Sequence, residues 1–142
     1  MEATIALRLP RDAASVPVIR QTLDGTLRSL HVVRPIREDI ELMLSEACAN
    51  VIRHAVQSDE YTVSAGVYHD RCVIRVVDTG GGFDPHSVGD PAPGAEYGRG
   101  LQIMRALADD VRFTQRREHG TIVSLEKKLR FEDEAPFPTP RP

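Results

Sequence analysis

Several features that mark familiar protein classes are scarce in this chain of 142 residues. It contains no tryptophan, only 5% aromatic residues and two cysteines. No apolar run approaches the roughly 20 residues that a membrane-spanning helix needs, so we expect no membrane association. Residues 1–10 include Glu2 and Arg8 and lack the apolar core of a signal peptide. These observations predict a cytoplasmic protein.

A strong excess of one charge is also missing. The formal net charge is -3, whereas proteins that bind nucleic acid independently of sequence are strongly basic, so we expect no direct nucleic-acid partner. The composition, with 41% hydrophobic and 27% charged residues, is ordinary for a globular protein. We assign one domain to residues 1–130 and expect the acidic, then proline-rich tail at 131–142 to be disordered.

The two cysteines, Cys48 and Cys72, are 24 positions apart and form no C-x-x-C pair. Each lies among apolar residues. We therefore expect two buried, reduced thiols rather than a disulfide or a metal site.

Hydrophobic periodicity predicts the order of helices and strands. Alternating apolar residues predict a strand over 4–9. A helix capped by Asp12 is expected to run to about residue 31, and Pro35 opens a second helix that runs to about residue 56. Further strands are expected at 61–68, 72–77, 111–116 and 121–127, and a short helix at 101–108.

This order predicts an α+β fold, a two-layer sandwich with helices on one face of a mixed, mostly antiparallel sheet. The other face of the sheet is expected to be partly exposed. Residues 78–100 hold seven of the ten glycines and three prolines, so irregular structure is expected through most of this stretch.

Three polar residues recur every four positions on the second long helix: Glu46, Asn50 and His54. This spacing places them on one helix face. A carboxylate can accept a proton from a nucleophile, and a carboxamide oxygen one turn away can ligate a hard cation such as Mg²⁺. On these residues alone, a polar helix face in water is the better interpretation.

A second motif follows the strand at 72–77. The strand delivers Asp78 at its end, and Gly80 and Gly82 allow a flat group to approach the backbone closely. A carboxylate can accept a hydrogen bond from the adenine amino group, which the carbonyl of guanine cannot offer. The alternative is an ordinary acidic turn, which the run of three glycines makes less suitable.

The third motif, Gly98-Arg99-Gly100-Leu101, opens the short helix in this interpretation. Free N–H groups at a helix N-terminus can bind an anion, and glycines permit close approach. The motif is neither a P-loop nor a dinucleotide fingerprint. Arg99 could pair with phosphate, but a solvated arginine is an equal alternative.

Taken in order, the three motifs resemble the ATP-binding (Bergerat) fold of the GHKL superfamily of gyrase, heat-shock chaperone, histidine kinase and mismatch-repair ATPases. The resemblance covers about residues 4–128. The segment S-E-A-x-x-N-x-x-x-H-A at residues 45–55 is most similar to the bacterial anti-sigma-factor serine/threonine kinases.

The resemblance implies a role for each residue on the helix and strands. Asn50 would coordinate Mg²⁺ that bridges the phosphates of ATP, and Glu46 would be the catalytic general base. Asp78 would bind the adenine amino group with support from Thr121. His54 belongs to the family pattern, but we expect a structural role for it near the helix end.

The resemblance also implies roles for the loops. Gly80 and Gly82 would shape the base pocket, and residues 84–97 would form a short lid over the phosphates. The motif Gly98-Arg99-Gly100-Leu101 would close on the phosphates as part of the nucleotide site.

The implied function is that of an anti-sigma factor with serine/threonine kinase activity. Such a protein binds Mg-ATP, sequesters a sigma factor and phosphorylates an anti-sigma-factor antagonist, and family members commonly form homodimers. Two alternatives stay open: a nucleotide-binding regulatory module without phosphotransfer, and a detached ATPase domain of the histidine kinase type.

Overall fold

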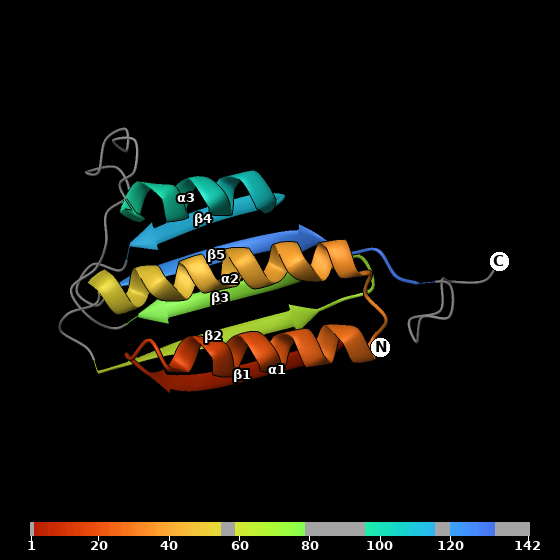
Figure 1. The fold of residues 1–142 in the computed structure, drawn as a ribbon, viewed down its shortest axis with the longest axis horizontal. Helices are drawn as coiled ribbons and strands as arrows, with labels where there is room; N and C mark the ends of the chain where they lie inside the picture. Colours follow the sequence, from red (N-terminus) through yellow and green to blue (C-terminus); the bar gives the residue numbers. More distant parts are fainter. Residues whose placement is uncertain (1, 55–58, 79–95, 116–119, 133–142) are drawn as a thin grey trace.

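The computed structural model describes residues 2–54, 59–78, 96–115 and 120–132. Each helix and strand expected from the sequence is present there (Figure 1). The elements are β1 (Ala3–Pro10), α1 (Ser15–Ser29), α2 (Arg34–His54), β2 (Glu60–Val67), β3 (Arg71–Asp78), α3 (Glu96–Leu107), β4 (Asp110–Gln115) and β5 (Thr121–Lys128).

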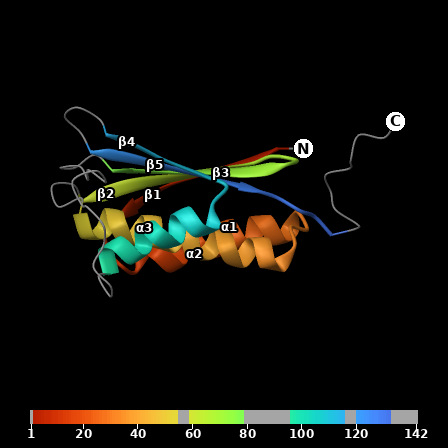
Figure 2. The same ribbon diagram turned by 90° about the horizontal axis from the view of Figure 1, so that it is seen from above.

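The strands form one five-stranded sheet in the order β1-β2-β3-β5-β4. Every described pair of neighbours is antiparallel. Helices α1, α2 and α3 lie on one face of this sheet, and the other face carries none of the described helices (Figure 2). The α+β fold class predicted from the sequence is therefore confirmed.

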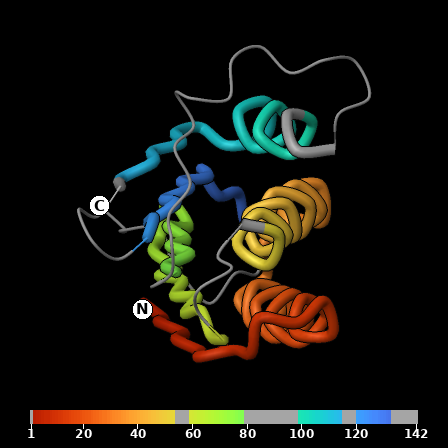
Figure 3. The backbone as a smooth tube through the Cα atoms, turned by 90° about the vertical axis from the view of Figure 1, so that its left-hand side faces the viewer, coloured from red at the N-terminus to blue at the C-terminus, as the bar shows by residue number. Residues whose placement is uncertain are grey.

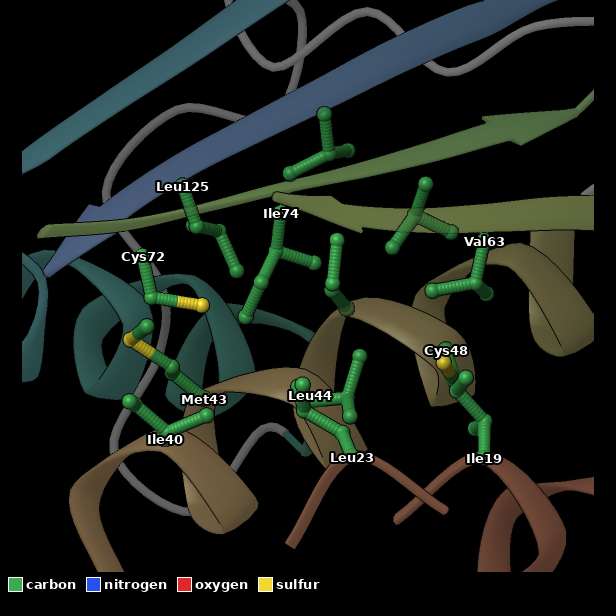
Figure 4. Packing of buried hydrophobic residues seen from close by; sticks show 14 of the residues in the cluster. Ile19, Leu23, Ile40, Met43, Leu44, Cys48, Val63, Cys72, Ile74 and Leu125 are labelled. Atoms are coloured by element: carbon green, nitrogen blue, oxygen red, sulfur yellow. The ribbon is translucent and has the colours of Figure 1, made fainter. Parts of the chain in front are cut away.

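The core lies between the sheet and the helices. Alternation along the strands produces it, because every second residue of β2 and β3 is buried. In Figure 4, Ile74 and Leu125 of the sheet point towards Met43 and Leu44 of α2. All four side chains are at most 1% exposed. Burying residues of this size stabilises a fold by about 1.5–3 kcal/mol each, so α2 is held firmly against the sheet.

The start of α1 differs from the prediction. Asp12 precedes the helix, which begins at Ser15, and accepts a hydrogen bond at Oδ1 from the backbone N–H of Ala14 at 3.0 Å. The carbonyl of Asp12 accepts a further bond from the backbone N–H of Ser15 at 2.9 Å. Asp12 therefore closes a turn before the helix instead of capping it.

The start of α3 is a larger correction. The sequence predicted a helix from residue 101, but α3 begins at Glu96 and contains Gly98 and Gly100. Glycine disfavours a helix by about 1 kcal/mol relative to alanine, which obscured the first turn in the sequence. Contact between α3 and α2 overrides that local preference.

The two thiols are buried and free, as predicted. Helix α2 carries Cys48, and β3 carries Cys72. Burial raises the pKa of each thiol to about 12, because the thiolate would lose its hydration in the core.

The last described residues pair with the segment between α1 and α2. Phe131 forms a bridge with Val32, and the backbone N–H of Glu132 donates to the carbonyl of His31 at 2.8 Å. Described pairing thus extends beyond the boundary that we drew at residue 130. No helix in the described part of the chain is both long and apolar enough to cross a membrane.

Gly25 offers a direct test of helix stability. It lies inside α1, and a Cβ added there would meet no atom within 4 Å. Gly25→Ala should raise the free energy of unfolding by up to about 1 kcal/mol, because alanine favours the helix and no neighbour is displaced. Urea unfolding measures this change. A lower free energy of unfolding would contradict the open surroundings of Gly25.

The buried thiols predict a loss of stability at alkaline pH. An ordinary thiol here releases its proton near pH 9.0, whereas the folded protein holds those of Cys48 and Cys72 up to about pH 12. Their contribution is complete below pH 9 and falls between pH 9 and 12, by up to about 1.4 kcal/mol per pH unit for each thiol. Urea unfolding across this interval should show a shallower fall for Cys72→Ala; an identical slope would contradict this account.

Candidate nucleotide-binding site

Four chain segments that carry the sequence motifs meet at one end of the molecule. They are the end of α2, the end of β3, the beginning of α3 and the beginning of β5, which gather at the left in Figure 1 and face the viewer in Figure 3. Antiparallel pairing of β3 with β5 explains part of this arrangement, since one strand begins where its neighbour ends.

Glu46 and Asn50 face α3, as their spacing of one helical turn predicts. A Cβ built on Gly100 would lie 2.7 Å from Oε2 of Glu46 and 3.8 Å from Oδ1 of Asn50. The carboxylate of Glu46 and the carboxamide of Asn50 therefore both lie next to Gly100 of α3. Glu46 and Asn50 are thus turned towards another helix and do not form a solvated outer face.

Asn50 is 4% exposed, and its amide nitrogen Nδ2 finds no hydrogen-bond acceptor among the described residues. Leaving a buried polar group without a partner costs about 1–3 kcal/mol. A bound ligand that supplies an acceptor would remove this cost. Glu46, one turn earlier, is partly exposed.

Asp78 and Thr121 lie side by side at the ends of two strands. Val77 pairs with Ile122, so the next position in the register places Asp78 beside Thr121. Both are buried, at 3% and 2% exposure. They occupy the inward-facing positions of their strands, towards the helices.

Asp78 and Thr121 form a row across neighbouring strands that continues to Tyr61 of β2, a residue that the sequence motifs did not reveal. Tyr61 pairs directly with Asp78 and is 1% exposed. Its hydroxyl lies 2.6 Å from Oγ of Ser15, which itself donates to the carbonyl of Asp12. Tyr61 therefore donates to Ser15, and a further hydrogen bond links it to Cys48. Only the β2–β3 register could have identified this neighbour.

The glycine motifs are only partly described. Gly80, Gly82 and the lid up to residue 95 lie outside the described residues. Gly98 belongs to the first turn of α3, whose N–H groups have no partner within the helix. Arg99 is exposed and Leu101 is buried in the core. His54 is the last residue of α2, with its side chain outside the described part.

A concavity of about 580 Å³ lies at the opposite end of the sheet, next to the start of α2 and the end of β5. Two of its cationic side chains form ion pairs. Nζ of Lys127 lies 3.1 Å from Asp39, and Nε of Arg71 lies 2.9 Å from Glu126. This concavity contains none of the residues of the three motifs.

The family of the chain follows from comparison with known proteins. Residues 9–127 match the family of histidine kinase-like ATPase domains. The chain belongs to this family, which confirms the resemblance seen in the motifs.

Named relatives point to one branch of the family. The chain is 31% identical over 140 residues to a serine-protein kinase RsbW of Bacillus cereus, covering 90% of this chain and 86% of the relative. It is 30% identical to the serine-protein kinase RsbW of Bacillus mycoides, with the same coverage.

A solved structure shows the same fold. It contains the RsbU and RsbW domains of a Mycobacterium tuberculosis protein, and it matches with a TM-score of 0.70 and 18% identity. The match covers 89% of this chain and 32% of that longer chain.

If Asp78 accepts a hydrogen bond from the adenine amino group, Asp78→Asn should weaken ATP binding sharply. A charge-assisted hydrogen bond at a buried site is worth about 1.5–3 kcal/mol, which corresponds to a rise in Kd of roughly 10- to 150-fold. Calorimetric titration with ATP and GTP measures this change. Equal affinity of the wild type for ATP and GTP would contradict the base-reading role.

Proposed function

We propose that this chain is a Mg-ATP-dependent protein serine/threonine kinase that also acts as an anti-sigma factor. The observation that carries the proposal is the juxtaposition of Glu46 and Asn50 beside α3. A scaffold that only bound a partner would need neither a carboxylate nor a buried carboxamide at this point. The relatives named serine-protein kinase support the same activity.

Asn50 has the donor chemistry to hold a hydrated metal ion and phosphate together. Its amide oxygen suits Mg²⁺, which prefers oxygen ligands, and its unpartnered Nδ2 suits a phosphate oxygen. When bound, Mg²⁺ neutralises charge that develops on the phosphates. The buried amide thus fits the group that the family implies.

Helix ends at this site add a matching electrostatic pattern. The beginning of α3 presents free N–H groups and the positive end of its dipole, which favours phosphate. The end of α2 presents the negative end of its dipole close to Asn50, which favours a cation. The end of α2 and the beginning of α3 lie at the same end of the molecule (Figures 1 and 3), so the two helix ends would favour a cation and an anion in adjacent positions.

Glu46 would act as the general base. Its carboxylate accepts the proton of a substrate serine or threonine hydroxyl as that oxygen bonds to the γ-phosphorus of ATP. The bond between the γ-phosphorus and the bridging oxygen then breaks, and ADP leaves. In such reactions the protein mainly positions groups and offsets charge, so few side chains suffice.

Asp78 and Thr121, which lie side by side at the strand ends, would recognise the adenine base. The carboxylate accepts a hydrogen bond from the adenine amino group, and the Thr121 hydroxyl supports it directly or through water. The rigid sheet beneath both residues limits their movement, which favours selection of one base over another.

The partners that we propose are a sigma factor and an anti-sigma-factor antagonist, in the cytoplasm. The phosphate acceptor would be a serine or threonine on the antagonist. We also propose a homodimer. The sheet face that carries none of the described helices supports an interface because Val73, Val77 and Ile122 are only partly buried there.

Phosphotransfer to a purified candidate antagonist tests the function. Wild type with Mg-ATP should yield a phosphoprotein that is stable to acid and labile to base. Glu46→Gln should reduce the rate at least about 100-fold, since general-base catalysis contributes about 10²–10⁴-fold, and should leave the Kd for ATP within a few-fold. Asn50→Ala should instead weaken ATP binding in the presence of Mg²⁺.

Each contrary result favours a different account. ATP binding without transfer would identify a regulatory module. An acid-labile product would indicate phosphohistidine and an ATPase domain of the histidine kinase type. Full activity of Glu46→Gln would exclude Glu46 as the base.

A further inference from the structure

Gly100 occupies an unusual place for a glycine. It is the fifth residue of α3 and is buried. A glycine inside a helix costs about 1 kcal/mol relative to alanine, so this position calls for a physical reason. Gly25 of α1 shows the contrast, since an added Cβ there would touch nothing within 4 Å.

The reason is the Glu46 carboxylate. A Cβ on Gly100 would lie 2.7 Å from Oε2 and 3.7 Å from Cδ of Glu46. Real Cβ atoms essentially never approach another heavy atom within 3.0 Å. Alanine at this position and the observed carboxylate therefore exclude each other.

Gly100 is also poorly placed to contact phosphate through its N–H. The first four N–H groups of a helix lack intrahelical acceptors, but the fifth donates to the carbonyl of the first residue. In α3 the free groups include the N–H of Gly98, which is the third residue of the helix. The two glycines of the motif thus differ in what their backbone can offer a ligand.

We propose that Gly100 is a positioning residue for the general base, because its missing side chain leaves the space in which the Glu46 carboxylate lies. This inference deepens the proposed function and rests on it. It assigns different roles to the two glycines. Gly98 lies where phosphate can reach the helix N-terminus, and Gly100 determines the position of the Glu46 carboxylate.

The flexibility of the Glu46 side chain determines whether Gly100→Ala disturbs the fold or only the position of the carboxylate. The nearest atom to the added Cβ is the far end of a partly exposed side chain, which can rotate away without moving either helix. Gly100→Ala should therefore leave the protein folded while displacing the carboxylate from its observed position.

The test compares Gly100→Ala, Glu46→Ala and the double variant, with Gly25→Ala as a control glycine in open space. Gly100→Ala should lower kcat for phosphotransfer at least about 100-fold and leave the Kd for ATP within about threefold. In the Glu46→Ala background it should lower kcat no further. Gly25→Ala should keep the wild-type rate and affinity.

Thermal unfolding tests the contact without any catalytic readout. Gly100→Ala should raise Tm more in the Glu46→Ala background than in wild type, because in wild type the Glu46 side chain must leave its observed rotamer to make room for the Cβ. Equal shifts in both backgrounds would overturn the inference even if the kinase is active.

Two further outcomes are decisive. A rise of tenfold or more in the Kd for ATP of Gly100→Ala would make Gly100 a nucleotide contact and overturn the positioning role. Absence of transfer by wild type would refute the proposed function, whereas the Tm comparison would still show whether Gly100 accommodates Glu46.

Discussion

Burial of α2 is the constraint on which the rest of the structure depends. This helix contacts α1, α3 and the sheet, and Met43, Leu44 and Ala47 on it are at most 1% exposed. Burial of these apolar residues fixes the rotation of α2 about its own axis. The directions in which the residues between them point are therefore fixed as well. Glu46 and Asn50 therefore face α3 as a consequence of core packing.

The same logic applies to the strands. Along β3 and β5, every second side chain points inward and most of these are apolar. Asp78 at the end of β3 and Thr121 at the beginning of β5 occupy inward positions of the same pattern, so they face the same side of the sheet. The polar residues of the candidate site are continuations of the core pattern at one end of the molecule. Asn50, Asp78 and Thr121 are buried against the core, which suits a site that must position a nucleotide accurately.

Local signals predicted much of this arrangement from the sequence. The alternation of β2 and β3 and the spacing of Glu46 and Asn50 required only periods of two and about four residues. The beginning of α3 could not be predicted because Gly98 and Gly100 disfavour a helix locally, and the contact with α2 that overrides this preference depends on the folded structure. Tyr61 was missed for a similar reason, since its position beside Asp78 depends on register between strands.

The central claim is that Mg-ATP binds where the end of α2 meets the start of α3. The side-chain amide of Asn50, which is buried without an acceptor in the described structure, reports on this most directly by ¹H–¹⁵N NMR. During titration with Mg-ATP, its Nδ2 resonances should shift and saturate at the Kd measured by calorimetry. Unchanged Asn50 resonances, with saturable shifts instead at Leu129 beside the opposite concavity, would contradict the account.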